Sequence, residues 1–157
     1  MSNTKSGENW TIVAVDGAAA GNPGPGGWAW YVKDTHWGAG GEEKTTNNRM
    51  ELTAVITALE ILEGPLHIIC DSRYVVDAAT KWRFGWKKRG WKKSDGSDVA
   101  NSDLMIELDK KLHGREVKFE WVKGHDGHHL NEHADSRARA AAEAVRDGRN
   151  IWRGPFN

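Results

Sequence analysis

The sequence predicts one α/β domain in which helices pack on the faces of a mixed, five-stranded sheet. Short segments rich in β-branched and aromatic residues predict the strands, and longer amphipathic or alanine-rich segments predict the helices. Along the chain, three strands are followed by a helix, a strand, two helices, a strand and a final helix. This order implies a mixed sheet covered by helices, and 157 residues suffice for a single core.

Residues 10–15 (Trp-Thr-Ile-Val-Ala-Val) predict the first strand, which leads into Asp16. The glycine- and proline-rich residues 18–27 are too few for a domain linker and predict a structured turn. Residues 28–33 and 35–40 predict two antiparallel strands joined by a tight connection. The other predicted elements are, in order, an amphipathic helix over 47–62 with Thr45 or Thr46 near its N-cap, a buried strand over 66–70, a helix over 74–82, a polar loop over 94–102, a helix over 103–113, a strand over 116–122 and an alanine-rich helix over 130–146.

The folded domain is therefore expected over residues 10–146, between a disordered N-terminal tail (1–9) and a C-terminal tail (147–157). The polar N-terminus does not resemble a secretory signal, and no apolar stretch approaches the roughly 18 residues that a membrane span needs. The single cysteine, Cys70, lies in an apolar run and predicts a buried thiol in a reducing compartment. We expect a cytoplasmic monomer that does not bind membranes.

Two aspartates follow predicted strands. Asp16 follows the first strand, and Asp71 follows the strand over 66–70. If these strands are neighbours, the two carboxylates meet at the edge where open α/β sheets usually place their sites. Either residue could instead be a turn former or a helix cap, and taken singly each favours that alternative.

Glu51 projects from the apolar face of the helix over 47–62. At about 100° per residue, it lies within about 60° of Ala54, Val55, Ala58 and Leu62. An unpaired carboxylate there would be costly, so we expect either a buried salt bridge or a bound metal ion. Asp135, in the first turns of the last helix, borders the buried face, although a favourable place near the helix N-terminus would also explain it.

Four acidic residues on four separate elements make a credible oxygen-ligand site for Mg²⁺ or Mn²⁺. Such clusters suit phosphodiester chemistry with two metal ions, in which one ion activates water and the other stabilises the leaving oxygen. The spacing of the four residues leaves the structural alternatives open.

The charge distribution indicates a surface that binds nucleic acid. The 22 basic and 22 acidic residues balance, yet seven basic and no acidic residues lie between Lys81 and Ser94. The rest of the chain carries 15 basic against 22 acidic residues. Three tryptophans, expected to be exposed, interleave with the cations, and this combination is typical of phosphate and base contacts. A solvated basic helix and a membrane-binding patch are the alternatives. The segment contains Lys81, Trp82, Arg83, Trp86, Lys87, Lys88, Arg89, Trp91, Lys92 and Lys93.

Histidines gather after the strand over 116–122. His125 is expected on a flexible loop, where a side chain that titrates near neutrality could move protons near the acidic residues. His129 and His133, spaced as i and i+4, invite a zinc interpretation, but without cysteines beside them we favour plain surface histidines there, as for His128.

Taken together, these residues resemble the type 1 ribonuclease H family in its bacterial form, from Trp10 to about Arg146. Any one of the matching blocks is modest evidence, whereas all of them in this order are highly specific. The blocks are Asp16-Gly17 with residues 21–27 (Gly-Asn-Pro-Gly-Pro-Gly-Gly), residues 45–52 (Thr-Thr-Asn-Asn-Arg-Met-Glu-Leu), residues 71–75 (Asp-Ser-Arg-Tyr-Val), residues 86–91 (Trp-Lys-Lys-Arg-Gly-Trp), residues 121–125 (Trp-Val-Lys-Gly-His) and Asn131-Glu132 followed by Asp135.

The resemblance implies the ribonuclease H-like fold and an endonuclease that cuts the RNA strand of RNA–DNA hybrids, leaving 5′-phosphate and 3′-hydroxyl ends. Asp16 would bridge two Mg²⁺ ions, although Mn²⁺ is also possible. Asp135 would join it on the ion that activates water, and Glu51 and Asp71 on the ion that faces the leaving oxygen. His125 would assist proton transfer or product release.

The resemblance also implies the substrate contacts. The basic segment, with Trp82, Trp86, Lys87, Lys88, Arg89 and Trp91, would grip the DNA strand. Asn22, Asn47 and Asn48 would contact the hybrid, and Thr46 and Asn101 would lie near a DNA phosphate. Contacts to 2′-hydroxyl groups and phosphates rather than base edges predict little sequence specificity.

The chain departs from the family pattern in Ala18-Ala19-Ala20, where small polar residues and cysteine are usual, and in Arg73, where glutamine is common. Both departures lie near the expected substrate path and bear on substrate contacts. Two rival functions remain: a non-catalytic module that binds hybrids, and a nuclease of the same fold that acts on DNA. The first predicts that at least one of the four acidic residues is missing, and none is.

Overall fold

The computed structural model describes residues 9–124 and 126–151. Its elements, in chain order, are β1 (Thr11–Ala19), β2 (Gly24–Lys33), β3 (His36–Thr45), α1 (Asn47–Ile61), β4 (Leu66–Cys70), α2 (Arg73–Asp77), a π-helical turn η2 (Ala78–Trp82), α3 (Arg83–Lys88), α4 (Ser102–Leu112), β5 (Val117–Trp121) and α5 (His129–Arg146). The predicted order of strands and helices is confirmed.

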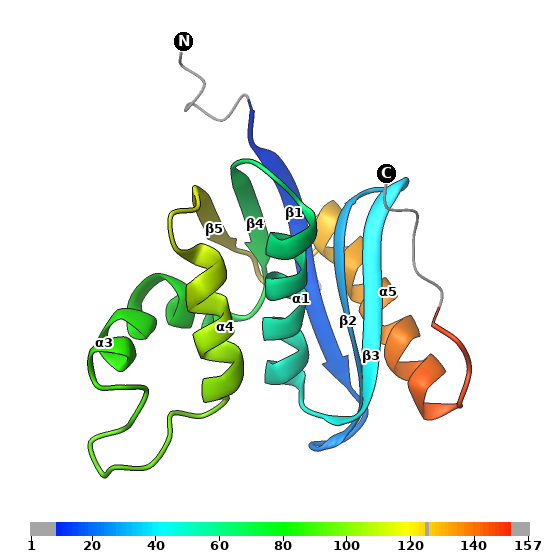
Figure 1. Ribbon diagram of the computed structural model, residues 1–157. Helices are drawn as coiled ribbons and strands as arrows, with labels where there is room; N and C mark the ends of the chain where they lie inside the picture. Colours follow the sequence, from blue (N-terminus) through cyan, green and yellow to red (C-terminus); the bar gives the residue numbers. More distant parts are fainter. Residues whose placement is uncertain (1–8, 125, 152–157) are drawn as a thin grey trace.

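The strands form one five-stranded sheet in the order β3-β2-β1-β4-β5 (Figure 1). β1, β2 and β3 pair antiparallel, whereas β1, β4 and β5 run parallel. Helical connections between the parallel strands explain this division, because a parallel pair cannot be joined by a tight turn. The prediction of a mixed sheet is therefore confirmed.

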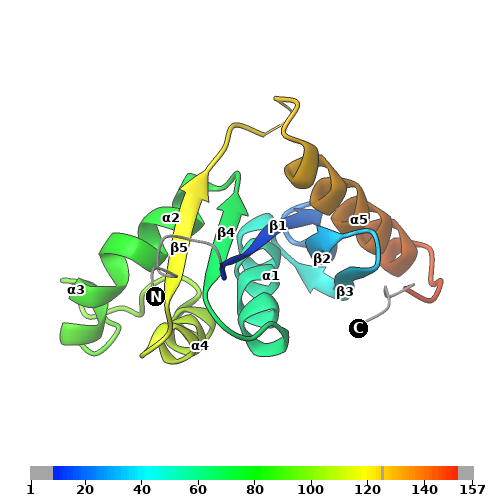
Figure 2. The same cartoon turned by 90° about the horizontal axis from the view of Figure 1, so that it is seen from above.

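Helices cover both faces of the sheet (Figure 2). On one face, α1 and α4 enclose a large apolar core that includes Val13, Val15 and Trp30. On the other face, α5 packs across β1, β2 and β3 over a smaller core built largely of alanine. Cys70 is buried, as predicted.

The strands around the first turn are longer than predicted. β1 continues to Ala19 and β2 begins at Gly24, so the predicted turn over 18–27 was wrong in extent. Glycine suits this strand because α5 lies directly on it: a Cβ atom at Gly27 would collide with the backbone of Ala138 and Ala142. β3 likewise extends beyond its predicted end, from His36 to Thr45.

The helices begin close to their predicted positions. The hydroxyl of Thr46 accepts a hydrogen bond of 3.2 Å from the backbone N–H of Arg49 and so caps α1. The helix predicted over 74–82 is longer, because α2 continues through η2 into α3 and ends at Lys88. None of the helices formed by the described residues is long and apolar enough to cross a membrane.

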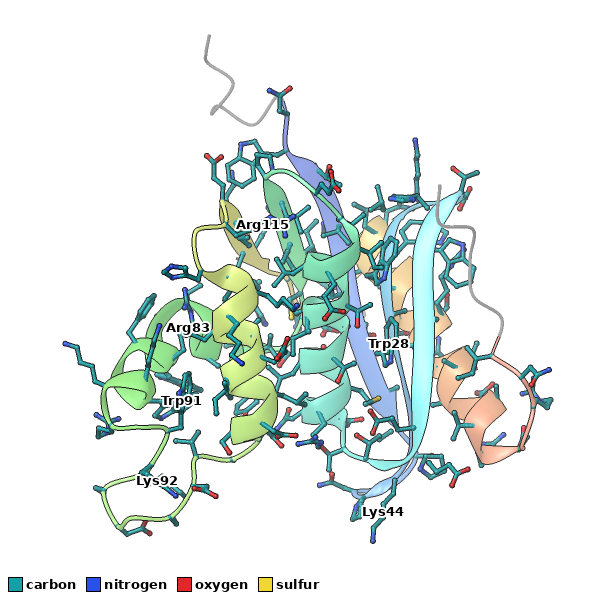
Figure 3. The ribbon with its side chains drawn as sticks, in the orientation of Figure 1. Trp28, Lys44, Arg83, Trp91, Lys92 and Arg115 are labelled. Atoms are coloured by element: carbon teal, nitrogen blue, oxygen red, sulfur yellow. The ribbon has the colours of Figure 1, made fainter. Side chains whose placement is uncertain are left out.

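The Arg115 side chain fastens the C-terminal end of α1 to the loop before β5 (Figure 3). Its guanidinium donates hydrogen bonds to the carbonyl groups of Leu59, Leu62 and Gly64. The last carbonyls of a helix lack intrahelical partners, so this one side chain satisfies groups that would otherwise need water.

Farther along the chain, Ile151 packs against the smaller core.

Candidate active site

Three carboxylates converge where β1, α1 and the end of β4 meet. One oxygen from each of Asp16, Glu51 and Asp71 lies within 4.8 Å of the others. The approach of α1 to β1 depends on Gly17, because a Cβ atom there would collide with the backbone of Met50 and Glu51. The sheet and the helix therefore bring together residues that are far apart in the sequence.

Asp16 lies inside β1, not at its end as predicted, because antiparallel pairing with β2 continues from Asp16 to Ala19. The parallel pairing with β4, in contrast, stops at Val15 and Cys70. Asp16 and Asp71 are thus the residues that follow the last parallel pair. The expectation that they meet at one edge of the parallel strands agrees with this register.

Burial and mutual repulsion disfavour negative charge in this cluster. Burial, followed by the charges of Glu51 and Asp71, raises the pKa of Asp16 to about 11. Burial and the charge of Asp71 raise the pKa of Glu51 to about 8. The pKa of Asp71 is also raised, first by burial and then by the charge of Asp135. Without a cation, the three groups do not ionise together at neutral pH.

The site fits a divalent cation. Glu51 is 8% exposed, and its Oε1 is buried without a hydrogen-bond partner among the described residues. A buried oxygen without a partner, beside two further carboxylates, is the arrangement that a hard cation compensates. The salt bridge offered by the sequence as an alternative is not formed by Glu51 within the described residues.

Asp135 approaches the cluster from α5. A hydrogen bond between Asp135 and Asp16 contributes to the raised pKa of Asp16. The Asp135 side chain is 16% exposed, and its Oδ2 accepts a hydrogen bond of 3.1 Å from Nε of Arg139, one helical turn away. Asp135 therefore faces both the buried acidic cluster and a surface cation.

Asn131 is a site residue to which the sequence assigned no role. It is 1% exposed, and its side chain hydrogen-bonds to Asp71, which lowers the pKa of that carboxyl against the effect of burial. A second close neighbour is Gly124, where a Cβ atom would lie 2.9 Å from Oδ2 of Asp71. One feature of the sequence could have revealed the contact between Asn131 and Asp71: Asn131 is an asparagine in the first turn of a helix whose other buried residues are all alanine.

The histidines have structural contacts, and His125 lies outside the described residues. His128 caps α5 by accepting a hydrogen bond of 3.4 Å from the backbone N–H of Asn131. The ring of His133 stacks on Tyr31 at 4.5 Å, and its Nδ1 lies 3.1 Å from Nη1 of Arg137. Nδ1 of His133 therefore accepts a hydrogen bond from the guanidinium, and His129 and His133 belong to no group of metal-ligating side chains found among the described residues.

The basic segment forms η2, α3 and the following turn, beside α4 (Figure 3). The prediction that all three of its tryptophans are exposed was wrong: Trp82 is 41% exposed, whereas Trp86 and Trp91 pack against the larger core. Apolar contact with the interior of the molecule outweighs the flanking charges. Phe84, which the sequence analysis did not single out, is 52% exposed.

Asp109, on α4, tethers the basic segment. It is 5% exposed, and its carboxylate lies 2.5 Å from Nη1 of Arg83 and 3.0 Å from Nζ of Lys87. Burial alone would raise the pKa of Asp109, but hydrogen bonds from Lys87 and Arg83 outweigh that effect and lower it. The charge of Lys87 is therefore partly compensated within the protein, whereas Lys88 and Arg89 are exposed and form no ion pair with other described residues.

The predicted hybrid-contacting asparagines gather near the β1–β2 turn. Asn22 lies in that turn, and Oδ1 of Asn47 accepts a hydrogen bond of 2.6 Å from the backbone N–H of Ala19. Asn22, Asn47 and Asn48 are exposed, and Thr46 is the cap of α1. These residues share one end of the molecule with the start of α1.

Two other predicted contact residues have partners within the protein. Nδ2 of Asn101 donates a hydrogen bond of 3.1 Å to the hydroxyl of Tyr74, and its Oδ1 lies 3.4 Å from Nη1 of Arg49. The exposed Arg73 places its guanidinium 4.4 Å from the ring centroid of Trp121, beside Asp71. Both side chains are thereby oriented before any substrate binds.

Comparison with known proteins gives consistent matches. Residues 8–143 match the family described as RNase H. The chain is 46% identical over 137 residues to a ribonuclease H of Tropheryma whipplei (strain Twist), covering 85% of each chain. It is 45% identical over 147 residues to a ribonuclease H of Rhizobium etli, covering 88% of this chain and 95% of the other. It is similar to the crystal structure of LC9-RNase H1, described as a type 1 RNase H with the type 2 active-site motif, with a TM-score of 0.73, 32% identity, and coverage of 87% of this chain and 74% of that one.

Proposed function

Because the chain belongs to the ribonuclease H family, we propose that it hydrolyses the RNA strand of RNA–DNA hybrids with two metal ions. The products would carry 5′-phosphate and 3′-hydroxyl ends. The observation that carries this proposal is the convergence of Asp16, Glu51 and Asp71, with oxygens within 4.8 Å of one another. This set of oxygens, from two buried residues and one half-buried residue, matches the demand of a divalent cation and of phosphodiester chemistry.

Asp16 is central to the proposed metal site, because its carboxyl group hydrogen-bonds to those of both Glu51 and Asp135. Glu51 and Asp71 would hold one ion with Asp16, and Asp135 would complete the site of the second. When bound, Mg²⁺ or Mn²⁺ supplies an activated water and stabilises charge on the leaving oxygen. His125 would assist proton transfer or product release.

The substrate would be held by charge and shape. Lys88, Arg89 and the exposed Trp82 offer phosphate and ring contacts on the basic segment, where they would grip the DNA strand. Asn22, Asn47 and Asn48, near the β1–β2 turn, offer polar groups to the minor groove, where 2′-hydroxyl groups identify RNA. None of these contacts requires a particular base, so little sequence specificity follows.

Neither rival function is favoured by the site. A non-catalytic module would not need four acidic residues at one place, and buried carboxylates without a role would only destabilise the protein. The asparagines and the basic segment favour a hybrid over DNA alone. We further propose that the protein is a cytoplasmic monomer, in keeping with the buried thiol of Cys70.

The test is a cleavage assay on four end-labelled substrates: an RNA–DNA hybrid, single-stranded RNA, duplex RNA and duplex DNA, each with Mg²⁺, with Mn²⁺ or with a chelator. The proposal expects metal-dependent cutting of the hybrid alone. Binding of the hybrid without cutting in either metal would support the non-catalytic module, and cutting of duplex DNA would support the DNA-acting nuclease.

A further inference from the structure

Asp71 differs from the other clustered carboxylates in how its main chain is held. Asp16 lies within β1 and Glu51 within α1, where regular hydrogen bonds fix the backbone. Asp71 lies between the end of β4 at Cys70 and the start of α2 at Arg73. A ligand in such a connection needs other contacts to hold its carboxylate in place.

Trp121, the last residue of β5, supplies such a contact. Its indole Nε1–H donates a hydrogen bond of 3.1 Å to the backbone carbonyl of Asp71. The pairing of Trp121 with Cys70 in the parallel ladder fixes the backbone of Trp121 next to the end of β4. The adjoining hydrogen bond of 3.0 Å from the Val122 N–H to the Cys70 carbonyl extends that ladder by one step. The guanidinium of Arg73 covers the Trp121 ring at 4.4 Å.

The carboxylate end of Asp71 is held separately. Asn131 hydrogen-bonds to the carboxyl group, and Gly124 lies beside it, where an added Cβ atom would be 2.9 Å from Oδ2. Trp121 therefore contacts the main chain of Asp71, while Asn131 contacts its side chain. Separate hydrogen bonds thus restrain the carbonyl and the carboxyl group of this one residue.

We propose that Trp121 is a positioning residue that sets the affinity of the carboxylate cluster for divalent cations. It touches neither the metal nor the substrate in this role, and acts through the Asp71 carbonyl. The inference rests on the proposed metal site. It gives a reason for a 39% exposed tryptophan at the edge of the sheet that does not involve stacking on a base.

Trp121→Phe tests this role, because it removes the indole N–H and leaves an aromatic ring under Arg73. Mg²⁺ is titrated into the protein without nucleic acid, and binding is followed by the NMR shifts of the Asp71 and Ser72 amides. We expect the Mg²⁺ dissociation constant to rise about fivefold, as expected for the removal of one hydrogen bond. The Mg²⁺ concentration for half-maximal cleavage should rise by the same factor, while the KM for the hybrid changes less than about twofold.

Trp10→Phe is the matched control. Trp10 lies beyond the opposite end of the parallel strands, and its ring also faces a cation, Nζ of Lys118 at 5.4 Å. The control should keep the wild-type Mg²⁺ affinity. An unchanged Mg²⁺ dissociation constant in Trp121→Phe, or an equal loss of affinity in Trp10→Phe, would overturn the inference.

The unaltered protein provides a second test that does not depend on the folding of a variant. During the Mg²⁺ titration, the indole N–H signal of Trp121 should shift with the same dissociation constant as the Asp71 amide, and that of Trp10 should not. A Trp121 indole signal that does not shift when Mg²⁺ is added would refute the positioning role of Trp121. Absence of hybrid cleavage with normal Mg²⁺ binding would instead refute the proposed function and leave this inference standing.

Discussion

Carboxylate oxygens of Asp16 and Glu51 lie within 4.8 Å of each other in the interior of the protein. Both groups have strongly raised pKa values, and burial is the first cause in each case. The metal-free protein therefore folds around groups that would be better solvated, and ionised, in water. Catalytic sites commonly carry this kind of destabilisation, which a bound ion relieves.

The first prediction concerns stability and pH. The folded-state pKa of Glu51 is about 8, above its ordinary value of 4.5, so the folded protein retains a proton that the unfolded chain releases. The free energy of unfolding of the metal-free protein should therefore fall as pH rises from about 5 to about 8. The upper bound is about 1.4 kcal/mol per pH unit for each retained proton. Urea unfolding at several pH values in the presence of a chelator measures this slope.

Glu51→Gln isolates the contribution of that residue. The amide cannot ionise, so the variant should show a shallower pH slope and greater stability than the wild type at pH 8. Saturating Mg²⁺ should stabilise the wild type at pH 8 and have a smaller effect on the variant. Equal slopes in the two proteins would show that Glu51 does not ionise with the raised pKa described above.

The second prediction concerns the basic segment. Lys88→Ala with Arg89→Ala removes two exposed cations for which the described part of the chain provides no ion pair. Hybrid affinity should fall, and the slope of log affinity against log salt should become shallower by about 0.9 for each phosphate that the variant no longer binds. Lys87 is unsuitable for this test, because its Nζ lies 3.0 Å from the buried carboxylate of Asp109.

Lys33→Ala, which removes an exposed cation at the end of β2, is the control for general charge effects. Binding isotherms at four or more salt concentrations give both slopes. If the double variant and the control show the same slope, the basic segment does not grip the phosphates.

The third prediction concerns the anchor of α1. Arg115→Ala should lower the free energy of unfolding by about 2 kcal/mol, because it removes charge-assisted hydrogen bonds to three carbonyls at the helix end. Arg146→Ala, which breaks an exposed pair with Asp147, should change stability by less than about 1 kcal/mol. Chemical denaturation distinguishes the two. Similar small effects would mean that Arg115 contributes no more than a surface ion pair.

Much of the fold could be predicted from local patterns. The strand over 66–70 and the capping residue Thr46 agree with their predictions, because apolar runs and cap chemistry are encoded locally. The continuation of β2 through Gly24–Gly27 could not be predicted, because those glycines resemble a turn until α5 packs on them. Only packing between distant parts of the chain makes a strand of that segment.

In the candidate site, too, local sequence patterns predicted some residues, whereas contacts between distant parts of the chain could not be predicted. Glu51 could be identified from its place on an apolar helical face, and Asp16 and Asp71 from the strands that precede them. The hydrogen bond between Trp121 and Asp71 joins residues 50 positions apart and has no local pattern. The partial burial of Trp86 and Trp91 could not be predicted either, since cations surround both residues in the sequence.

The most direct test of the central claim compares the wild type with Asp16→Asn on a hybrid whose RNA and DNA strands carry different fluorophores. Asp16 would be a ligand of both proposed ions, so its amide variant should lose RNA cleavage by at least about a hundredfold and bind the hybrid with an affinity within about threefold of the wild type. With Mg²⁺, the wild type should shorten only the RNA strand, and with a chelator neither strand. Retained turnover in Asp16→Asn, or RNA cleavage without metal, would contradict the carboxylate cluster as the site of a metal-dependent hydrolysis.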